Sequence, residues 1–191
     1  MNLERLVFVT SNLDKLREAE AVLDLQMAHR ALDIEEIQSL SLEAVVRHKA
    51  RTARSRIEGP VLVEDTALEL EGMDGFPGPL IRWLLSSVGP EGICTLAEAF
   101  ADRRAVVRCM ACALDGTEEI VGLGVVEGTI SKRPRGHRGF GWDSVFIPST
   151  GPGKTYAEMD PTEKNRISHR RLALEDPKNA VGIRPATTIA D

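Results

Sequence analysis

The sequence LVFVTSNLDKLREAEAVL, residues 6–23, joins two different hydrophobic periodicities at a polar turn. Residues 6–9 form a short apolar run, which is typical of a buried strand. From Leu13 onward, apolar residues recur with the spacing of a helix that buries one face. Ser11 and Asn12, in the turn between them, are both common helix caps. The segment therefore predicts a strand, a turn and a helix, as expected of an α/β fold.

The rest of the chain also mixes helical and β-rich segments. The expected elements are a helix over residues 41–57, a strand over 61–63, helices over 80–86 and 90–101, β-rich runs over 104–114 and 118–131, a loop over 132–143, a strand over 144–147 and a final helix that opens at Asp160. An Asp-Gly step joins the two β-rich runs, which predicts a hairpin. The 191 residues contain no repeat or linker and are 42% hydrophobic. We therefore predict one α/β domain over residues 1–191, with two lobes that meet at a cleft.

Charge and hydropathy exclude several classes of protein. The formal net charge is −5, and acidic and basic residues are mixed along the chain, so no basic stripe can follow a nucleic-acid backbone. The opening residues, MNLERLVFVT, carry an acid and a base before a very short apolar run, unlike a signal peptide. No segment is long enough to cross a membrane as a helix. We predict a cytoplasmic protein that binds neither a nucleic-acid polymer nor a membrane.

Three cysteines are present, and two of them have the spacing of half a zinc or redox site. Cys109 and Cys112 lie in a run that is expected to be a strand, where residues three apart face opposite sides of the sheet. They therefore cannot hold one metal together. We interpret both, with Cys94, as small core thiols.

The turn TSNLDK, residues 10–15, places polar and basic groups between a strand and a helix. Free amide groups and the positive end of the helix dipole favour an anion there, and Lys15 adds a full charge suited to a phosphate. The turn lacks the glycines of a Walker loop or a dinucleotide fingerprint, which disfavours both of those sites. Two interpretations of Thr10 and Asn12 stay open, a phosphate site and a plain helix cap.

Acidic residues follow the predicted strand at 61–63. Glu64 and Asp65 are expected to project from its carboxyl end, where open α/β sheets bind ligands, and Glu36 can approach from another connection. Mg²⁺ is usually held by one or two carboxylates together with the phosphates of a substrate. A metal would also explain how an acidic chain binds a polyanion. The alternative is that these acids are solvated loop residues.

The loop RGFGWD, residues 138–143, holds two of the few aromatic residues in a chain with 4% aromatic content. Glycines on both sides of Phe140 allow the loop to fold closely over a flat ligand. An aromatic ring there can stack on a base, which is worth about 1–3 kcal/mol in single-stranded nucleic-acid complexes. For Trp142, the alternative is a core position beside the strand at 144–147.

The segment EKNRISHRRLAL, residues 163–174, carries a local basic excess. Such a helix face is usually solvated, and a lone histidine is more often a hydrogen-bonded scaffold residue than a catalyst. If Lys164 and His169 contact one ligand, a continuous helix is unsuitable, because the two side chains stand about 140° apart around its axis. We therefore predict a break near Ile167 and Ser168.

Five motifs, taken in order, closely resemble those of the inosine triphosphate pyrophosphatase family. They are TSNLDK at 10–15, VLVEDT at 61–66, GFPGP at 75–79, FGWD at 140–143 and EKNRISHR at 163–170. The similarity runs from residue 5 to about residue 174. It implies a two-lobed, mixed-sheet α/β fold with a long central sheet, a nucleotide cleft between the lobes, and a homodimer. It also implies a Mg²⁺-dependent hydrolase that releases pyrophosphate from deaminated purine nucleoside triphosphates such as ITP, dITP and XTP.

The same resemblance implies roles for individual residues. The triphosphate-binding turn corresponds to Thr10, Ser11, Asn12, Leu13, Asp14 and Lys15, with Lys49 as a further phosphate contact. The metal-binding acids correspond to Glu36 and Asp65; Asp65 is also the implied proton acceptor, and Thr66 lies beside the substrate. The base is lined by Phe140, Gly141, Trp142 and Asp143, and its pocket is completed by Lys164, His169 and Arg170, with Arg82 as a further neighbour.

Residue chemistry and resemblance agree on a mechanism. Lys15 and Lys49 neutralise charge as the anhydride breaks, while Asp65 orients or deprotonates a water that attacks the α-phosphorus. Donors from His169, Arg170 or backbone amides meet a 6-oxo group, where adenine offers an amino group instead. Two alternatives stay open: a pyrophosphatase of different base preference, and a catalytically weak nucleotide-binding sensor.

The sequence differs from the family's usual motif residues at several positions. A glutamate replaces the proline of the usual PE dipeptide, so the metal acid is either Glu35 or Glu36. The tail at 176–191 matches none of the motifs and is expected to be loosely ordered. The other departures are Ser11 and Asp74, which stand in place of glycines, and Ser144, which stands in place of a proline. If the position of Ser11 requires a positive φ, serine would be strained there and would weaken phosphate binding.

Overall fold

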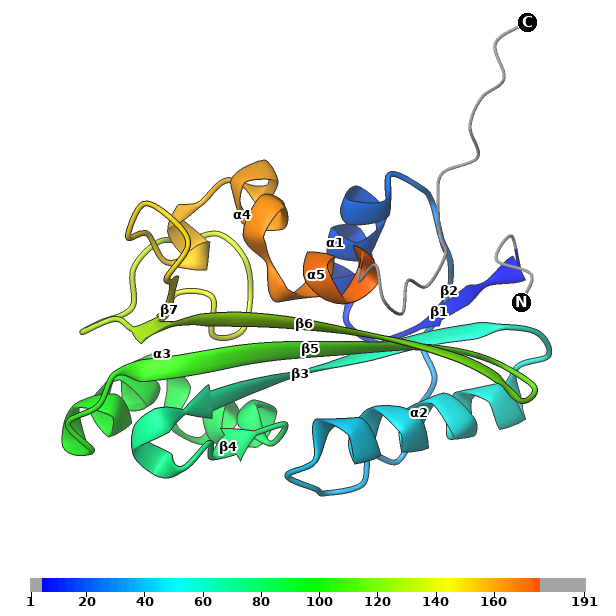
Figure 1. Ribbon diagram of the computed structural model, residues 1–191, viewed down its shortest axis with the longest axis horizontal. Coiled ribbons are helices and arrows are strands. Elements are labelled where there is room, and N and C mark those ends of the chain that lie inside the picture. Colours follow the sequence, from blue (N-terminus) through cyan, green and yellow to red (C-terminus); the bar gives the residue numbers. More distant parts are fainter. Residues whose placement is uncertain (1–4, 176–191) are drawn as a thin grey trace, which may run out of the picture.

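A mixed seven-stranded sheet organises the chain in the computed structural model, which describes residues 5–175 (Figure 1). The elements, in chain order, are β1 Val7–Val9, α1 Leu13–Leu23, β2 Ala28–Arg30, α2 Leu42–Arg56, β3 Val61–Leu70, η2 Glu71–Met73, β4 Pro77–Gly78, α3 Ile81–Ala99, β5 Arg104–Asp115, β6 Glu118–Ile130, β7 Phe146–Pro148, η3 Tyr156–Glu158, α4 Pro161–Ile167 and α5 His169–Glu175. The sheet order is β2-β1-β3-β5-β6-β7, and β4 pairs with β3. The predicted mixed α/β fold is confirmed. The tail at 176–191 lies outside the described residues.

Parallel and antiparallel strands share this sheet. β1 runs parallel to β2 and β3, whereas β3, β5, β6 and β7 are successively antiparallel. β5 and β6 form the predicted hairpin, which turns at Gly116 with a φ of +60°. β1 pairs with β3 only at Val7 and Phe8, so β3 continues beyond the end of β1. This divergence leaves room for a site at the carboxyl end of β1.

The predicted helix starts are confirmed by their capping contacts. The Asn12 side chain accepts hydrogen bonds from the amides of Asp14 and Lys15 at the start of α1. Ser41 caps α2, and Asp160 caps α4 by accepting from the amide of Glu163 at 2.8 Å. Such caps satisfy amide groups that have no partner within the helix. These local contacts explain why the three starts could be predicted.

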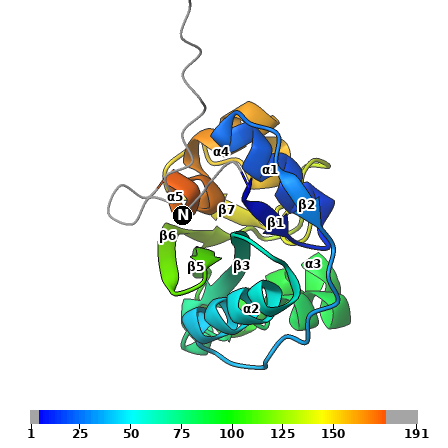
Figure 2. The ribbon, with the colours of Figure 1, turned by 90° about the vertical axis from the view of Figure 1, so that its right-hand side faces the viewer.

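Helices cover both faces of the sheet (Figures 1 and 2). The side chains between the helices and the sheet form the core. α1 and α5 pack over one face with Phe8, Leu62 and Cys109, and α2 packs over the other with Val63 and Cys112. α3 closes the far end, against a third cluster that also contains Trp142. Cys109 and Cys112 therefore face opposite sides, as predicted, and the three cysteines are free and buried.

Three expectations about the strands were wrong. The strand expected at 61–63 runs on to Leu70, because it pairs with β5 along its whole length. The short strands β2 and β4 were not predicted, and β7 begins at Phe146 rather than residue 144.

Among the described residues, no helix is both long and apolar enough to cross a membrane.

Candidate active site

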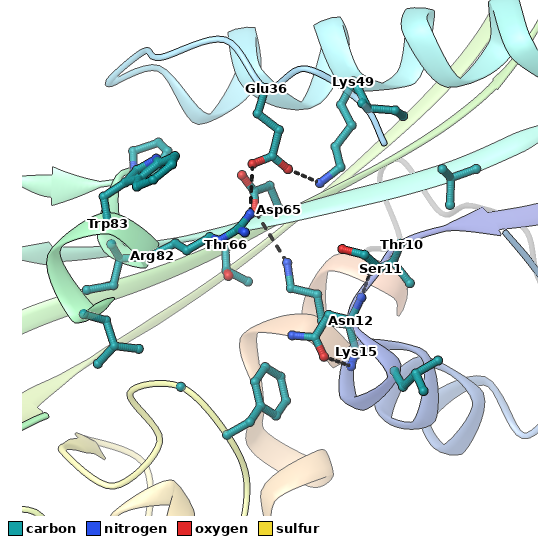
Figure 3. Close-up of a pocket in the computed structure, with 18 of the residues that line it drawn as sticks. Thr10, Ser11, Asn12, Lys15, Glu36, Lys49, Asp65, Thr66, Arg82 and Trp83 are labelled. Atoms are coloured by element: carbon teal, nitrogen blue, oxygen red, sulfur yellow. Dashed lines mark hydrogen bonds and ion pairs between the residues drawn. The ribbon is translucent and has the colours of Figure 1, made fainter. Parts of the chain in front are cut away.

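A cavity of about 970 Å³ opens where β1 ends and β3 continues. Its walls come from the turn after β1, the connection before α2, α2 itself, β3, the start of α3 and the loop at 140–142 (Figure 3). The predicted site residues that line it are Thr10, Ser11, Asn12, Leu13, Lys15, Glu36, Lys49, Asp65, Thr66, Arg82, Phe140, Gly141 and Trp142. Segments far apart in the sequence thus meet in one cleft.

The turn after β1 is held in shape by its own side chains. The Thr10 hydroxyl oxygen accepts from the amide of Asn12 at 3.1 Å, and Asn12 caps α1. Ser11 is exposed, and it is not one of the described residues with a positive φ. The strain considered for a serine at this position is therefore absent. Asp74, by contrast, does adopt a φ of +50°, which aspartate tolerates better than most residues.

Lys15 reaches from the first turn of α1 to two carboxylates of β3. Its amino group lies 2.7 Å from Oε1 of Glu64 and 3.4 Å from Oδ1 of Asp65. Burial alone would lower the pKa of Lys15, but the two carboxylates outweigh it and raise that pKa above its ordinary value. Lys15 is therefore charged throughout the physiological pH range.

Glu64 and Asp65, although adjacent, face different environments. Both lie within β3, where successive side chains alternate between the faces of the sheet. Asp65 lines the cavity, whereas Glu64 is only 3% exposed and binds Lys15 and Arg170. The expectation that both acids project from the carboxyl end of a strand was wrong, because β3 continues past them.

A second lysine and acid face Asp65 across the cleft. The Lys49 amino group of α2 lies 2.8 Å from Oε1 of Glu36, and Arg82 lies 3.8 Å from the other oxygen of that carboxylate. Burial would raise the pKa of Glu36, but Lys49 and Arg82 hold it below its ordinary value. Figure 3 shows Asp65 between the Glu36–Lys49 pair and Lys15. Glu36 rather than Glu35 lines the cavity.

These acids have the character of a divalent-cation site completed by a ligand. In the described chain, no three His, Cys, Asp or Glu side chains group closely enough to hold a metal. Three acidic residues, Asp33, Glu36 and Asp65, do line the cavity, and the last two are the predicted metal ligands. Mg²⁺ commonly takes one or two carboxylates plus phosphate oxygens and water. The donor set therefore fits Mg²⁺ bound together with a phosphorylated ligand.

The loop at 139–143 is shaped by two glycines and one aspartate. Gly139 and Gly141, on either side of Phe140, have φ values of +70° and +62°. The Phe140 amide donates to Oδ2 of Asp143 at 2.9 Å, and Lys164 lies 2.7 Å from the same oxygen. Despite that ion pair, burial keeps the pKa of Asp143 above its ordinary value. The loop is thus tied to α4.

The Phe140 ring covers the cations behind it. Its centroid lies 5.0 Å from the Lys164 amino group and 5.7 Å from the Arg170 guanidinium carbon. Trp142 packs in the core, 5.4 Å from the ring of His169, as its core interpretation predicts, and it also lines the cavity. Phe140 also lines a second cavity of about 210 Å³, with Asp14 and Lys164.

Three predicted site residues are buried behind the loop rather than exposed in either cavity: Asp143, His169 and Arg170. The predicted helix break is confirmed, since Ser168 is extended, with a ψ of 148°, and α5 begins at His169. Burial, with Arg170 and Lys164 nearby, holds the pKa of His169 well below its ordinary value. His169 is therefore neutral at pH 7.

Two functional positions were missed from the sequence. Glu18 of α1 pairs with both Lys164 and Arg170, and Trp83 lines the cavity while 58% exposed. Glu18 follows Lys15 by three residues and so shares its face of the helix, which was an available signal. The cations that Glu18 meets lie about 150 positions later in the chain, and no local pattern indicates that contact.

Comparisons with known proteins found similar sequences. The Ham1 family matches residues 6–180. The chain is 44% identical to inosine triphosphate pyrophosphatase 2 of Trypanosoma cruzi, over 89% of this chain and 88% of that protein. It is also 44% identical to the inosine triphosphate pyrophosphatase of Neurospora crassa, over 87% of each chain.

Solved structures show the same fold. A HAM1 protein from Coxiella burnetii is 29% identical, with a TM-score of 0.73 over 90% of this chain and 94% of that one. A nucleoside-triphosphatase described as a dITP/XTP pyrophosphatase, from Mycobacterium abscessus, is 26% identical. Its TM-score is 0.68, over 90% of this chain and 97% of that one.

Proposed function

Because the chain belongs to the Ham1 family, we propose that it hydrolyses deaminated purine nucleoside triphosphates, such as ITP, dITP and XTP, to the monophosphate and pyrophosphate. It is thus a nucleoside triphosphate pyrophosphatase, like the relatives that it matches. One observation carries the proposal: a single cleft combines two lysines, the acidic residues Glu36 and Asp65, and an aromatic loop. These groups suit the phosphates, a divalent cation and the base of one nucleotide.

The triphosphate is proposed to lie between Lys15 and Lys49. The two amino groups come from different helices on different sides of Asp65 (Figure 3). Each is already paired with a carboxylate, so the substrate phosphates would share or replace those contacts. Positive charge that is fixed before the reaction stabilises the charge that develops as the anhydride breaks.

Asp65 is the proposed base. It lines the cavity, so its carboxylate can accept a proton from a water or orient that water. The water would attack the α-phosphorus in line, and pyrophosphate would leave without a covalent intermediate. Glu36 and Asp65 would hold Mg²⁺ with the phosphates, and the ion would supply charge neutralisation and polarisation of phosphate oxygens.

The base is proposed to lie against Phe140. Because the ring of Phe140 covers Lys164 and Arg170, a base that reaches those cations has to displace the ring or slide beneath it. Lys164 and Arg170 are donors and suit the 6-oxo group of a deaminated purine, whereas the amino group of adenine would leave them unpaired. His169, being neutral, carries one ring N–H donor.

The first test is pyrophosphate release from ITP, XTP, GTP and ATP with Mg²⁺. For Asp65→Asn we expect kcat on ITP to fall by about 10²–10⁴-fold, the range lost when a general base is removed. Asp102→Asn is a matched control, because Asp102 is an acid that pairs with Arg104 at 2.6 Å outside the cleft. Wild-type rates in Asp65→Asn would refute its role, and equal rates on ATP and ITP would refute the base selection.

Strain at Ser11 would be one cause of a catalytically weak sensor, and the backbone at Ser11 does not have that strain. Tight nucleotide binding without pyrophosphate release would nevertheless establish the sensor.

We also propose a homodimer, which sedimentation equilibrium would test directly. A monomer at micromolar concentration would refute the homodimer.

A further inference from the structure

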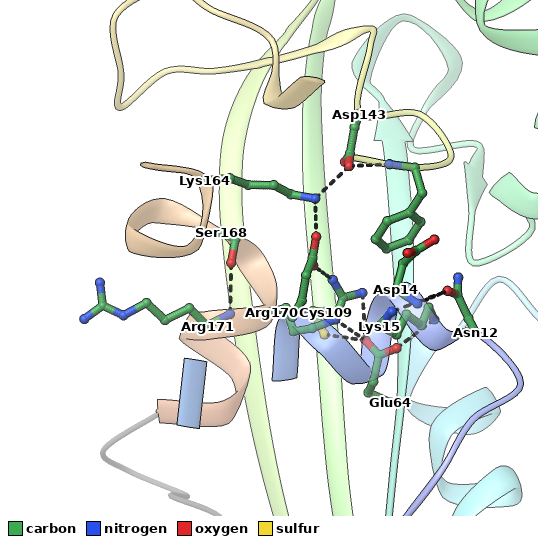
Figure 4. Close-up of polar contacts among 12 residues, drawn as sticks. Asn12, Asp14, Lys15, Glu64, Cys109, Asp143, Lys164, Ser168, Arg170 and Arg171 are labelled. Atoms are coloured by element: carbon green, nitrogen blue, oxygen red, sulfur yellow. Dashed lines mark hydrogen bonds and ion pairs between the residues drawn. The ribbon is translucent and has the colours of Figure 1, made fainter. Parts of the chain in front are cut away.

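A chain of alternating charges runs behind the cleft, from the phosphate turn to the base loop (Figure 4). Its members, in order of contact, are Lys15, Glu64, Arg170, Glu18, Lys164 and Asp143. We name these six residues the ion-pair chain. Three cations and three carboxylates balance one another, and the last carboxylate accepts from the amide of Phe140. The two ends of the proposed substrate site are thereby physically connected.

Glu64 is the member that joins the phosphate end to the rest. Its Oε1 lies 2.7 Å from the Lys15 amino group. Its Oε2 accepts from Nε and a terminal nitrogen of Arg170, each at 3.3 Å, and from the Cys109 thiol at 3.1 Å. These donors come from α1, α5 and β5. The side chain is also 98% buried and does not line the cavity, and each of its oxygens already contacts a cation.

We infer that Glu64 is a positioning residue, which holds Lys15 and Arg170 in one geometry without contacting substrate. The inference rests on the proposed function of the cleft. Lys15 lies closer to Glu64 than to Asp65, by 2.7 Å against 3.4 Å, so the tether of Lys15 is Glu64. Asp65 consequently keeps its carboxylate directed at the cavity. Of the two adjacent acids, Glu64 thus has the positioning role and Asp65 the chemical role.

The negative charge of Glu64 is as important for holding Lys15 as the length of its side chain. The charged groups that face the Lys15 amino group are Glu64 and Asp65 on β3, Arg170 on α5 and, across the cleft, Glu36. Burial and Arg170 both oppose the charge on Lys15, and Glu64 is the nearest group that supports it. Without the Glu64 charge, two buried cations would flank a neutral amide. Lys15 would then lose its nearest counter-ion, at 2.7 Å, and its fixed position beside the proposed phosphate site.

The test compares Glu64→Gln with Glu69→Gln. Glu69 is a matched control, because it is on the same strand and pairs with Arg108 at 2.9 Å, away from the cleft. The mobility of the Lys15 amino group is read from ¹⁵N relaxation in lysine-labelled protein, and its signal is assigned by its loss in Lys15→Met. For Glu64→Gln we expect a more mobile Lys15 amino group and about a 100-fold loss of kcat on ITP, comparable to removing one fixed electrostatic contact. Glu69→Gln should match wild type in both.

Glu64→Asp covers the case in which Glu64→Gln does not fold. It keeps the charge but loses one methylene, so it cannot reach Lys15 and Arg170 together. We expect a loss of kcat of at least about tenfold, as for a small misplacement of a catalytic group. Wild-type kcat in this variant would overturn the inference.

The remaining outcomes separate this inference from the proposed function. An unchanged mobility of the Lys15 amino group in Glu64→Gln would overturn the inference, whatever the rate. If the wild-type protein releases no pyrophosphate from ITP, the proposed function fails. The relaxation measurement would still decide whether Glu64 holds Lys15, because it does not depend on turnover.

Discussion

Replacing Gly124 by alanine is expected to push α5 away from the sheet. A Cβ at Gly124 of β6 would lie 1.9 Å from the carbonyl oxygen of His169 and 2.6 Å from the amide nitrogen of Ala173. Carbon and oxygen approach to about 3.3 Å in close Cα–H···O contacts, so the helix backbone has to retreat by roughly 1.4 Å. His169 and Arg170 would move with it, away from the base loop.

Overpacking usually costs about 1–3 kcal/mol. Both obstructing atoms belong to the backbone and cannot rotate away, so we expect a loss of about 3 kcal/mol in the free energy of unfolding, near the top of that range. For a chain of this size, that corresponds to a fall in Tm of roughly 6–12 °C. Urea denaturation followed by circular dichroism measures the loss, and the KM for ITP should rise in parallel.

Gly151→Ala is the matched control. A Cβ there would meet side-chain atoms no closer than 3.6 Å, and the position has no positive φ. We expect a change within about 0.5 kcal/mol, as for most surface substitutions. If Gly124→Ala unfolds at the same urea concentration as Gly151→Ala, the close contact between β6 and α5 is refuted.

Three further predictions concern the site itself. His169 is unprotonated when folded, whereas the unfolded residue titrates near 6.5, so the free energy of unfolding should fall by up to about 1.4 kcal/mol per pH unit as the pH drops below 6.5. His169→Gln should flatten that slope in urea denaturation at pH 5.5 and 7.5. An unchanged slope would show that another group causes the pH dependence of stability. Glu36→Gln should raise the Mg²⁺ concentration for half-maximal activity by about tenfold, as removing one carboxylate weakens a site of this kind; an unaltered Mg²⁺ titration would exclude Glu36 as a ligand. Phe140→Leu should raise the KM for ITP by about tenfold, the equivalent of a stacking contact, and a wild-type KM would remove Phe140 from the base site.

The parts of the fold that the sequence predicts are those whose cause is local. The caps at Asn12, Ser41 and Asp160 lie within three residues of the amides that they satisfy. The turn at Gly116 likewise needs only its own positive φ. Each signal is contained in a few consecutive residues, so a single sequence is sufficient to find it.

The parts that escaped prediction depend on distant partners. β2 has three residues, two of them exposed, and exists as a strand because it pairs with β1. β3 continues past Glu64 because it pairs with β5, and the burial of Glu64 within it is tolerated because Lys15 and Arg170 supply opposite charges. Neither cause lies near the segment that it shapes.

The candidate site also has parts with a local cause and parts that depend on distant partners. The turn around Lys15 and the loop around Phe140 were predicted from local chemistry and resemblance, and the structure brings both to one cleft. Arg170 was expected at the base, but it is buried behind Phe140 because Glu18 and Glu64 hold it there. The position of a charged side chain depends on its counter-ions, and these are found only when the fold is known.

Glu64 and Asp65 illustrate why residue type alone does not assign a function. Both are carboxylates, they are adjacent, and either could bind a metal or accept a proton. What separates them is the two-residue period of a strand, which turns one toward Lys15 and Arg170 and the other toward the cavity. That separation exists only if the strand continues past both residues. The length of β3, set by its pairing with β5, therefore decides which carboxylate is free for chemistry.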